Sequence, residues 1–88
     1  MSARHLAWLR TLPCVVPGCL NRRIEAHHIR TAANSGVGMK PDDSFAVPCC
    51  FDHHREYHNH GRKTFERKYG LDLLVEAERY AASSGRDL

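Results

Sequence analysis

Two groups of cysteine and histidine residues in this 88-residue chain have spacings that can bind metal ions. The first group joins a cysteine pair near the N-terminus to a Cys-x2-His pair in the middle of the chain: Cys14, Cys19, Cys50 and His53. Two short ligand pairs from distant parts of a chain make a tetrahedral zinc site. We therefore expect a structural zinc ion here; the alternative is a set of buried cysteines without a metal.

Cys49 and Cys50 are adjacent, and the sequence leaves open which of them is the ligand. Cys50 is the better candidate because it has the two-residue spacing to His53. Cys49 would then follow the preceding strand inward as a small apolar residue. A disulfide between neighbouring cysteines is strained. The N-terminus lacks the apolar segment of a signal peptide, so we expect a cytoplasmic protein with reduced cysteines.

The second group consists of four histidines in two pairs. His54 and His58 are four residues apart, so on a helix they share one face. His27 and His28 are adjacent, so on a strand they point to opposite sides. One of them can then bind a metal ion while the other faces a substrate atom. Two patterned pairs beside a separate cysteine set favour a second metal site over four unrelated surface residues.

The elements that must position these residues can be predicted from hydrophobic spacing and from glycine and proline. We expect helices over residues 3–10, 51–59, 64–69 and 73–80 and strands over residues 24–29 and 45–47. Pro48 should end the second strand, and Gly61 and Gly70 should end two helices. A loop rich in Gly, Asn, Asp and Pro separates the strands. This order predicts a single α+β domain over residues 1–88.

Charge and hydropathy indicate which kinds of partner the protein is suited to bind. The formal net charge is +3 and the isoelectric point is about 8.8, which is compatible with a polyanion without requiring one. No apolar stretch approaches the length of a membrane span, so we expect no membrane association.

Two segments of the chain together resemble the HNH (ββα-metal) endonuclease family. They read EAHHI at 25–29 and VPCCFDHH at 47–54, with His58 one helical turn later. In that family a strand carries a His-His or Asp-His pair, and a helix carries the remaining metal ligands. With residues 36–43 and FERKYG at 65–70, the pattern is more narrowly similar to small phage and prophage nucleases of the Ref (recombination enhancement function) kind.

The resemblance implies a DNA endonuclease with a ββα-metal, treble-clef-like core, a structural zinc site and flanking helices. It implies a divalent catalytic metal ion (Zn²⁺, Mn²⁺, Ni²⁺ or Mg²⁺) with three histidine ligands, namely His27, His54 and His58. It implies a structural Zn²⁺ with the ligands Cys14, Cys19, Cys50 and His53. His28 matches the general base that activates water. The family's usual Asn before the second strand is absent, and Asp43 or Ser44 is expected to substitute for it.

DNA is the expected partner, and basic residues near the motif are candidates to contact its phosphates. These residues are Arg30, Lys40, Arg55, Arg62 and Lys63. Each of them could equally belong to a solvated face. No segment looks like a base-reading helix, so we expect weak sequence preference. The oligomeric state stays open, with a homodimer among the possibilities.

The main alternative is a zinc-binding, nucleic-acid-binding module without catalysis. It explains the cysteines and the charge but leaves the four patterned histidines without a role. A metallopeptidase is disfavoured because Glu56 stands one position later than the His-Glu-x-x-His motif requires. A toxin or a partner-dependent subunit is also open. The letters HNH at 58–60 are not the family motif, and we interpret His60 as a residue at a helix end.

Overall fold

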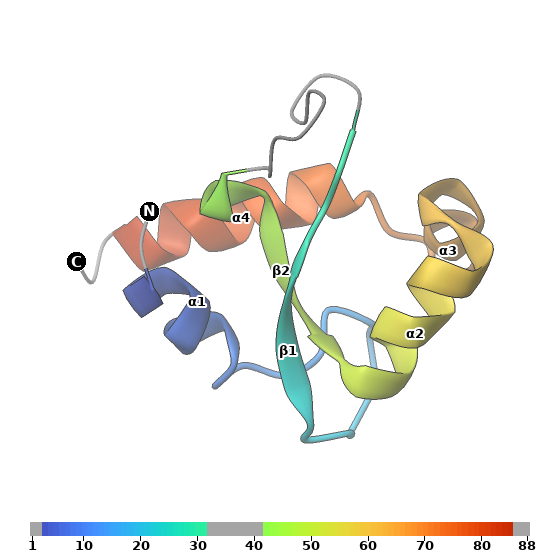
Figure 1. Ribbon diagram of the computed structural model, residues 1–88, viewed down its shortest axis with the longest axis horizontal. Helices are drawn as coiled ribbons and strands as arrows, with labels where there is room; N and C mark the ends of the chain where they lie inside the picture. The colour runs from blue at the N-terminus through green and yellow to red at the C-terminus, as the bar shows by residue number, and fades with distance from the viewer. Residues whose placement is uncertain (1–2, 32–41, 86–88) are drawn as a thin grey trace.

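The computed structural model describes residues 3–31 and 42–85. Within them lie a two-stranded antiparallel sheet and four α-helices, which confirms the α+β class. The elements are α1 (Ala3–Leu9), β1 (Ile24–His28), the 3-10 helix η1 (Asp43–Phe45), β2 (Ala46–Cys50), α2 (Phe51–His60), α3 (Arg62–Tyr69) and α4 (Leu73–Gly85). The strands run through the middle of the molecule, between α1 on one side and α2 and α3 on the other (Figure 1). None of the described helices is long and apolar enough to cross a membrane.

The strand pairing brings the two histidine- and cysteine-bearing segments together. β1 and β2 are antiparallel, with Ile24 opposite Cys50 and His28 opposite Ala46. Every residue of β2 is buried, whereas β1 is mostly half-buried. β2 continues directly into α2, because Cys50 is both the last strand residue and the N-cap of the helix. The junction therefore places the first turn of α2 beside the start of β1.

The second strand extends further than the sequence predicted. Pro48 lies inside β2, opposite Ala26, and does not end the strand. Its carbonyl oxygen accepts a hydrogen bond from the Val15 N–H at 2.8 Å, so this side of the residue faces the N-terminal loop and not β1. Proline is tolerated where its missing N–H falls outside the ladder, as on an edge strand. The prediction that Pro48 terminates the strand was wrong for this reason.

The helix ends agree closely with the breakers read from the sequence. Gly61 and Gly70 follow α2 and α3, and both have positive φ, which glycine adopts without strain. Asp72 caps α4, since its Oδ1 accepts from the Val75 N–H at 3.3 Å. The predicted interstrand loop, including Lys40, falls largely on residues 32–41, outside the described residues.

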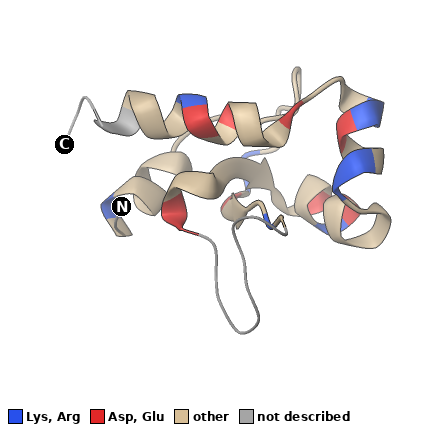
Figure 2. Ribbon diagram, turned by 90° about the horizontal axis from the view of Figure 1, so that it is seen from above, with Lys and Arg blue, Asp and Glu red and all other residues tan. Residues whose placement is uncertain are grey.

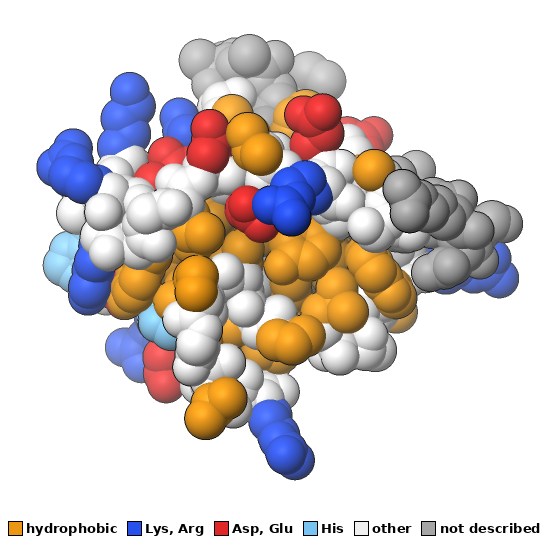
Figure 3. Space-filling model, turned by 180° about the vertical axis from the view of Figure 1, so that it is seen from behind, with side chains coloured by type: hydrophobic (Ala, Val, Ile, Leu, Met, Phe, Trp, Pro, Cys, Tyr) orange, Lys and Arg blue, Asp and Glu red, His pale blue; other side chains and the backbone are white. Residues whose placement is uncertain are grey.

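One core connects the N-terminal loop to β2, α3 and α4. Its buried members are Cys14, Val15, Val16, Ile29, Val47, Cys50, Phe65, Leu73 and Ala77. α4 packs on η1, β2 and α1, which closes the core from the side opposite the viewer of Figure 1. Seen from behind, hydrophobic side chains gather across the middle of this face, and charged side chains lie mostly around them (Figure 3).

α1 contributes a buried histidine that the sequence did not single out. His5 is fully buried, and neither of its ring nitrogens has a hydrogen-bond partner within the described structure. Burial lowers the pKa of His5, which keeps its imidazole neutral.

Candidate metal centres

The cysteine cluster has the geometry that a tetrahedral metal ion requires. Cys14, Cys19, Cys50 and His53 each offer one ligand atom, and the four atoms lie within 4.8 Å of one another. The Sγ atoms of Cys19 and Cys50 are 3.8 Å apart, and His53 Nδ1 lies 3.1 Å from Cys50 Sγ and 3.5 Å from Cys14 Sγ. Zinc–sulfur bonds of about 2.3 Å at tetrahedral angles give a sulfur–sulfur edge of about 3.8 Å. The donor set therefore fits a metal such as zinc.

Local backbone structure holds these four side chains in place. Gly18, with φ of +79°, turns the chain so that Cys19 returns toward Cys14. The Cys50 N–H donates to Cys14 Sγ at 3.3 Å, and the His53 N–H donates to Cys50 Sγ at 3.3 Å. Backbone donors of this kind favour the thiolate, which is the form of cysteine that binds a metal.

Cys49 lies beside the cluster without joining it. It is buried, and the interaction of its thiol with the Cys14 sulfur lowers the pKa of Cys14 to about 4. The same interaction, together with burial, raises the pKa of Cys49 itself, so Cys49 stays protonated. The ambiguity between the two adjacent cysteines is thus resolved geometrically, because Cys50 is the one grouped with His53.

A second cluster is formed by histidines from β1 and α2. His27, His54 and His58 each offer a ring nitrogen, and these atoms also lie within 4.8 Å of one another. The ring centroid of His27 lies 4.1 Å from that of His54 and 5.3 Å from that of His58, with the planes nearly parallel. Because these three ring nitrogens lie so close together, they are potential ligands for a single ion. The predicted trio is therefore together in space.

His27 is the most informative member of this cluster. It is only 3% exposed, and its Nε2 has no hydrogen-bond partner in the described structure. Burial, together with the nearby His54 and His58, lowers the pKa of His27 to about 3. A metal ligand must be a neutral imidazole, which His27 is at neutral pH. A buried nitrogen without a partner is costly, and a bound cation would remove that cost.

Glu25 is a residue of this site that the sequence reading missed. Its Oε1 accepts from His54 Nδ1 at 2.7 Å. A carboxylate only accepts, so Nδ1 carries the proton and Nε2 keeps its lone pair for a metal. A signal was present in the sequence, because Glu25 lies two residues before His27 and so shares its face of the strand. Its pairing with α2 could not be read from that spacing.

Replacing Glu25 by glutamine should weaken the histidine metal site by about 10- to 100-fold, the usual effect of losing an outer-shell partner. Competition with a chromophoric chelator measures the metal dissociation constant directly. The tightly held metal of the cysteine cluster should be unaffected. Glu76→Gln, which changes a carboxylate on α4, is the matched control. Equal metal affinity of Glu25→Gln and the parent would show that Glu25 does not orient His54.

His28 is paired with a carboxylate from the opposite end of the interstrand connection. Its Nε2 lies 2.8 Å from Asp43 Oδ1, and both side chains are largely buried. The sequence leaves Asp43 and Ser44 open as replacements for the missing Asn, and Asp43 is the one that contacts His28. Because the carboxylate requires a proton on Nε2, the neutral ring has its lone pair on Nδ1. This pairing fixes which nitrogen of His28 can accept a proton.

The three clustered histidines and His28 border one open pocket of about 340 Å³. Its lining consists of Ala26, His27, His28, Arg30, His54, Tyr57 and His58. Tyr57, which the sequence did not point to, meets His27 edge-on with 4.2 Å between ring centroids. His28 and Arg30 thus share a hollow with the three clustered histidines.

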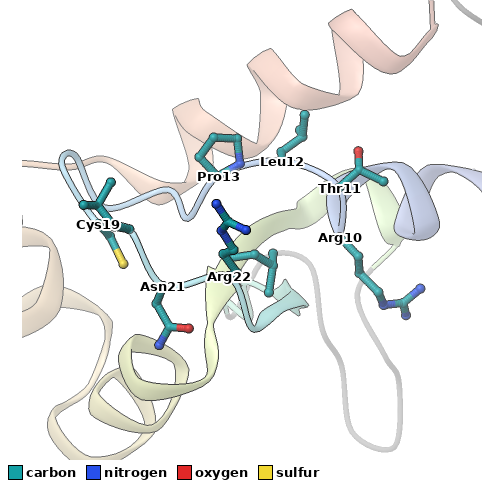
Figure 4. Close-up of a pocket in the computed structure, with 9 residues that line it drawn as sticks. Arg10, Thr11, Leu12, Pro13, Cys19, Asn21 and Arg22 are labelled. Atoms are coloured by element: carbon teal, nitrogen blue, oxygen red, sulfur yellow. The ribbon is translucent and has the colours of Figure 1, made fainter.

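The other candidate residues lie apart from this pocket. Arg62 forms an ion pair with Glu66 at 3.2 Å, and Glu66 also accepts from the Leu73 N–H, so Arg62 has a structural role. Lys63 is exposed on α3, and His60 is exposed at the end of α2, outside both metal-ligand groups. A second pocket of about 380 Å³ reaches from Arg10 to Ile24 past Cys19 (Figure 4). Of the residues that line it, Cys19 alone belongs to a group of potential metal ligands.

Comparison with known proteins finds relatives whose function is also open. A family model described as "Protein of unknown function (DUF968)" matches residues 1–85. The uncharacterized protein YdfU of Escherichia coli K12 is 34% identical over 73 residues, which is 83% of this chain and 20% of that protein. The chain therefore spans about a fifth of the length of this relative. No solved structure matches the chain significantly.

Proposed function

This chain belongs to the DUF968 family, and we propose that it is a metal-dependent DNA endonuclease of the HNH type. In this proposal β1, β2 and α2 form the ββα-metal unit, and the cysteine cluster is its structural zinc site in a treble-clef-like arrangement. The observation that carries the proposal is the buried Nε2 of His27, which has no hydrogen-bond partner among the described residues. His27 is grouped with His54 and His58 in the pocket that also contains His28.

His28 is the proposed general base. Asp43 holds its Nε2, so Nδ1 is the nitrogen that takes a proton from a water molecule. Asp43 then stabilises the imidazolium that forms, because its carboxylate stays hydrogen-bonded to Nε2. His27, His54 and His58 would hold a divalent ion, which would supply Lewis-acid stabilisation of the negative charge on the phosphate and leaving oxygens. Glu25 orients one of these ligands, and Tyr57 packs against another.

The pocket favours a polyanionic strand as substrate. It is open, and Arg30 on its wall is exposed and has no ion-pair partner in the described structure. Arg30 is therefore available for a phosphate oxygen next to the histidines. With the net charge of +3, this supports binding through the backbone of DNA and weak dependence on base sequence.

The alternative is a zinc-binding module that binds nucleic acid without cutting it. The cysteine cluster fits both functions equally well. The His28–Asp43 pair and the unsatisfied nitrogen of His27 favour the enzyme, because a binding module has no use for an oriented base beside a second ligand set.

A plasmid-nicking assay tests the proposal. The protein, treated with a mild chelator, should be inactive, and Mn²⁺, Ni²⁺, Zn²⁺ or Mg²⁺ should restore conversion of supercoiled plasmid to open circles. All-histidine ligation predicts that the transition metals restore more activity than Mg²⁺, which prefers oxygen ligands. Elemental analysis should find one retained zinc and one exchangeable metal per chain. One metal per chain, with no nicking under any of these ions, would favour the binding module.

A further inference from the structure

Two arginines share one aromatic ring at the start of α2. The guanidinium carbon of Arg23 lies 4.1 Å from the centroid of the Phe51 ring, and that of Arg55 lies 5.5 Å from it. The position of Arg23 is fixed through its backbone, because its carbonyl accepts from the Phe51 N–H at 2.9 Å and its N–H donates to Asn21 Oδ1 at 2.9 Å. Both side chains are exposed, so the ring holds two accessible positive charges near each other.

No carboxylate neutralises this pair within the described residues. Neither arginine forms an ion pair there. Of the acidic side chains closest in sequence, Glu25 pairs with His54, and Glu56 pairs with Lys68 and Tyr69. Asp52 accepts from the neutral amide of Asn21 and forms no ion pair with either arginine. Elsewhere acidic and basic residues are interspersed, as on α3 and α4 (Figure 2), where Arg62, Lys68 and Arg79 are ion-paired. The arginine pair is therefore available to bind an external anion.

The pair lies next to the histidine cluster on the surface of α2. Phe51, His54 and His58 have the i, i+3, i+7 spacing of a single helix stripe, and Arg55 flanks that stripe about 60° from His58. Along the helix axis Phe51 is about 4.5 Å from His54 and about 10.5 Å from His58. A DNA strand has one phosphate per about 3.4 Å of axis. A strand with one phosphate at the histidines can thus place another, one to three nucleotides away, at Phe51.

We propose that Arg23 and Arg55 form a phosphate-binding site for the DNA backbone that flanks the cleaved bond on the Phe51 side. This inference rests on the proposed endonuclease function. Phe51 holds both guanidinium groups ahead of binding, so less side-chain entropy is lost when the phosphates arrive. Arg30, at the other end of β1, lies on the opposite side of the histidine cluster along the strand. The strand would then be held on both sides of the bond that is cut.

The test is the salt dependence of DNA binding, measured by fluorescence anisotropy of a short labelled duplex in the His28→Ala background, where the duplex stays intact. Replacing both Arg23 and Arg55 by alanine should lower the slope of log K against log salt by about 1.8, at about 0.9 per lost phosphate contact. Affinity should fall about 30-fold at roughly 0.15 M salt. The Arg23→Lys/Arg55→Lys variant should recover most of the slope, because it keeps both charges.

The control is Lys68→Ala/Arg79→Ala, which removes the same charge from two exposed, ion-paired residues and should leave the slope nearly unchanged. Thermal unfolding of every variant checks that the fold is intact. If the Arg23→Ala/Arg55→Ala variant keeps the salt slope and DNA affinity of the His28→Ala protein, the proposed phosphate site is wrong while the endonuclease proposal stands. If the background protein itself does not bind the duplex, and the parent does not nick plasmid, both proposals are wrong.

Discussion

His28→Ala is expected to lower the rate of DNA nicking by about 10²–10⁴-fold, the contribution typical of a positioned general base. It should leave the metal content at two ions per chain, because His28 belongs to neither ligand group. DNA affinity should change little. The domain should stay folded, with a stability loss of about 1–3 kcal/mol because the Asp43 carboxylate loses its partner. Supercoiled-plasmid nicking under single-turnover conditions measures the cleavage rate, and elemental analysis measures the metal content.

His60→Ala is the matched control for this experiment. His60 is also on α2 and is exposed, outside both ligand groups, so its removal should leave nicking unchanged. The nicking rate of Asp43→Asn should lie between the rates of His28→Ala and His60→Ala. The amide oxygen can still accept from Nε2, but it stabilises the imidazolium less well than a carboxylate does. A His28→Ala protein that nicks at the parental rate would remove His28 as the base. One that loses a metal ion would show that His27 and His28 have exchanged roles.

Cys50→Ala should leave the domain unfolded at ambient temperature, whereas Cys49→Ala should not. The two residues are adjacent and both buried, but only Cys50 belongs to the four-ligand cluster. Structural zinc contributes about 10–16 kcal/mol to the folding of small zinc domains, which matches or exceeds the whole stability of a typical domain, about 5–15 kcal/mol. Cys49→Ala removes one buried thiol that is not a member of the cluster, a loss of about 1 kcal/mol.

Circular dichroism measures whether Cys50→Ala and Cys49→Ala are folded, and elemental analysis measures how much zinc each variant holds. His58→Ala adds a third comparison, because it should lose the exchangeable metal and nicking while keeping the fold and the zinc. Equal stability of Cys50→Ala and Cys49→Ala would mean that the cluster does not hold a structural ion. Equal destabilisation by Cys50→Ala and His58→Ala would mean that the ligands have been divided wrongly between the two sites.

The local features of this chain could be predicted because each depends on a few neighbouring residues. Helical spacing placed His54 and His58 on one face, and glycines marked the ends of α2 and α3 where the structure has them. The Cys-x2-His spacing selected Cys50 over Cys49, and the structure groups Cys50 with His53. The prediction for Pro48 was wrong because proline ends a strand only where its missing N–H would face the partner strand. Which side of the strand is paired is a property of the sheet and not of the local sequence.

The sequence by itself determined the members of the two clusters of potential metal ligands and the α+β order of the elements, since residue type and short-range spacing carry that information. Only the tertiary structure decided which side chains complete each site. Glu25 reaches His54 across 29 positions, Asp43 reaches His28 across 15, and Arg23 reaches Phe51 through the start of β1. These contacts depend on the register of β1 against β2 and on the direction in which α2 leaves Cys50. Such geometry is set by the packing of the whole core, so no spacing within a single segment could have predicted it.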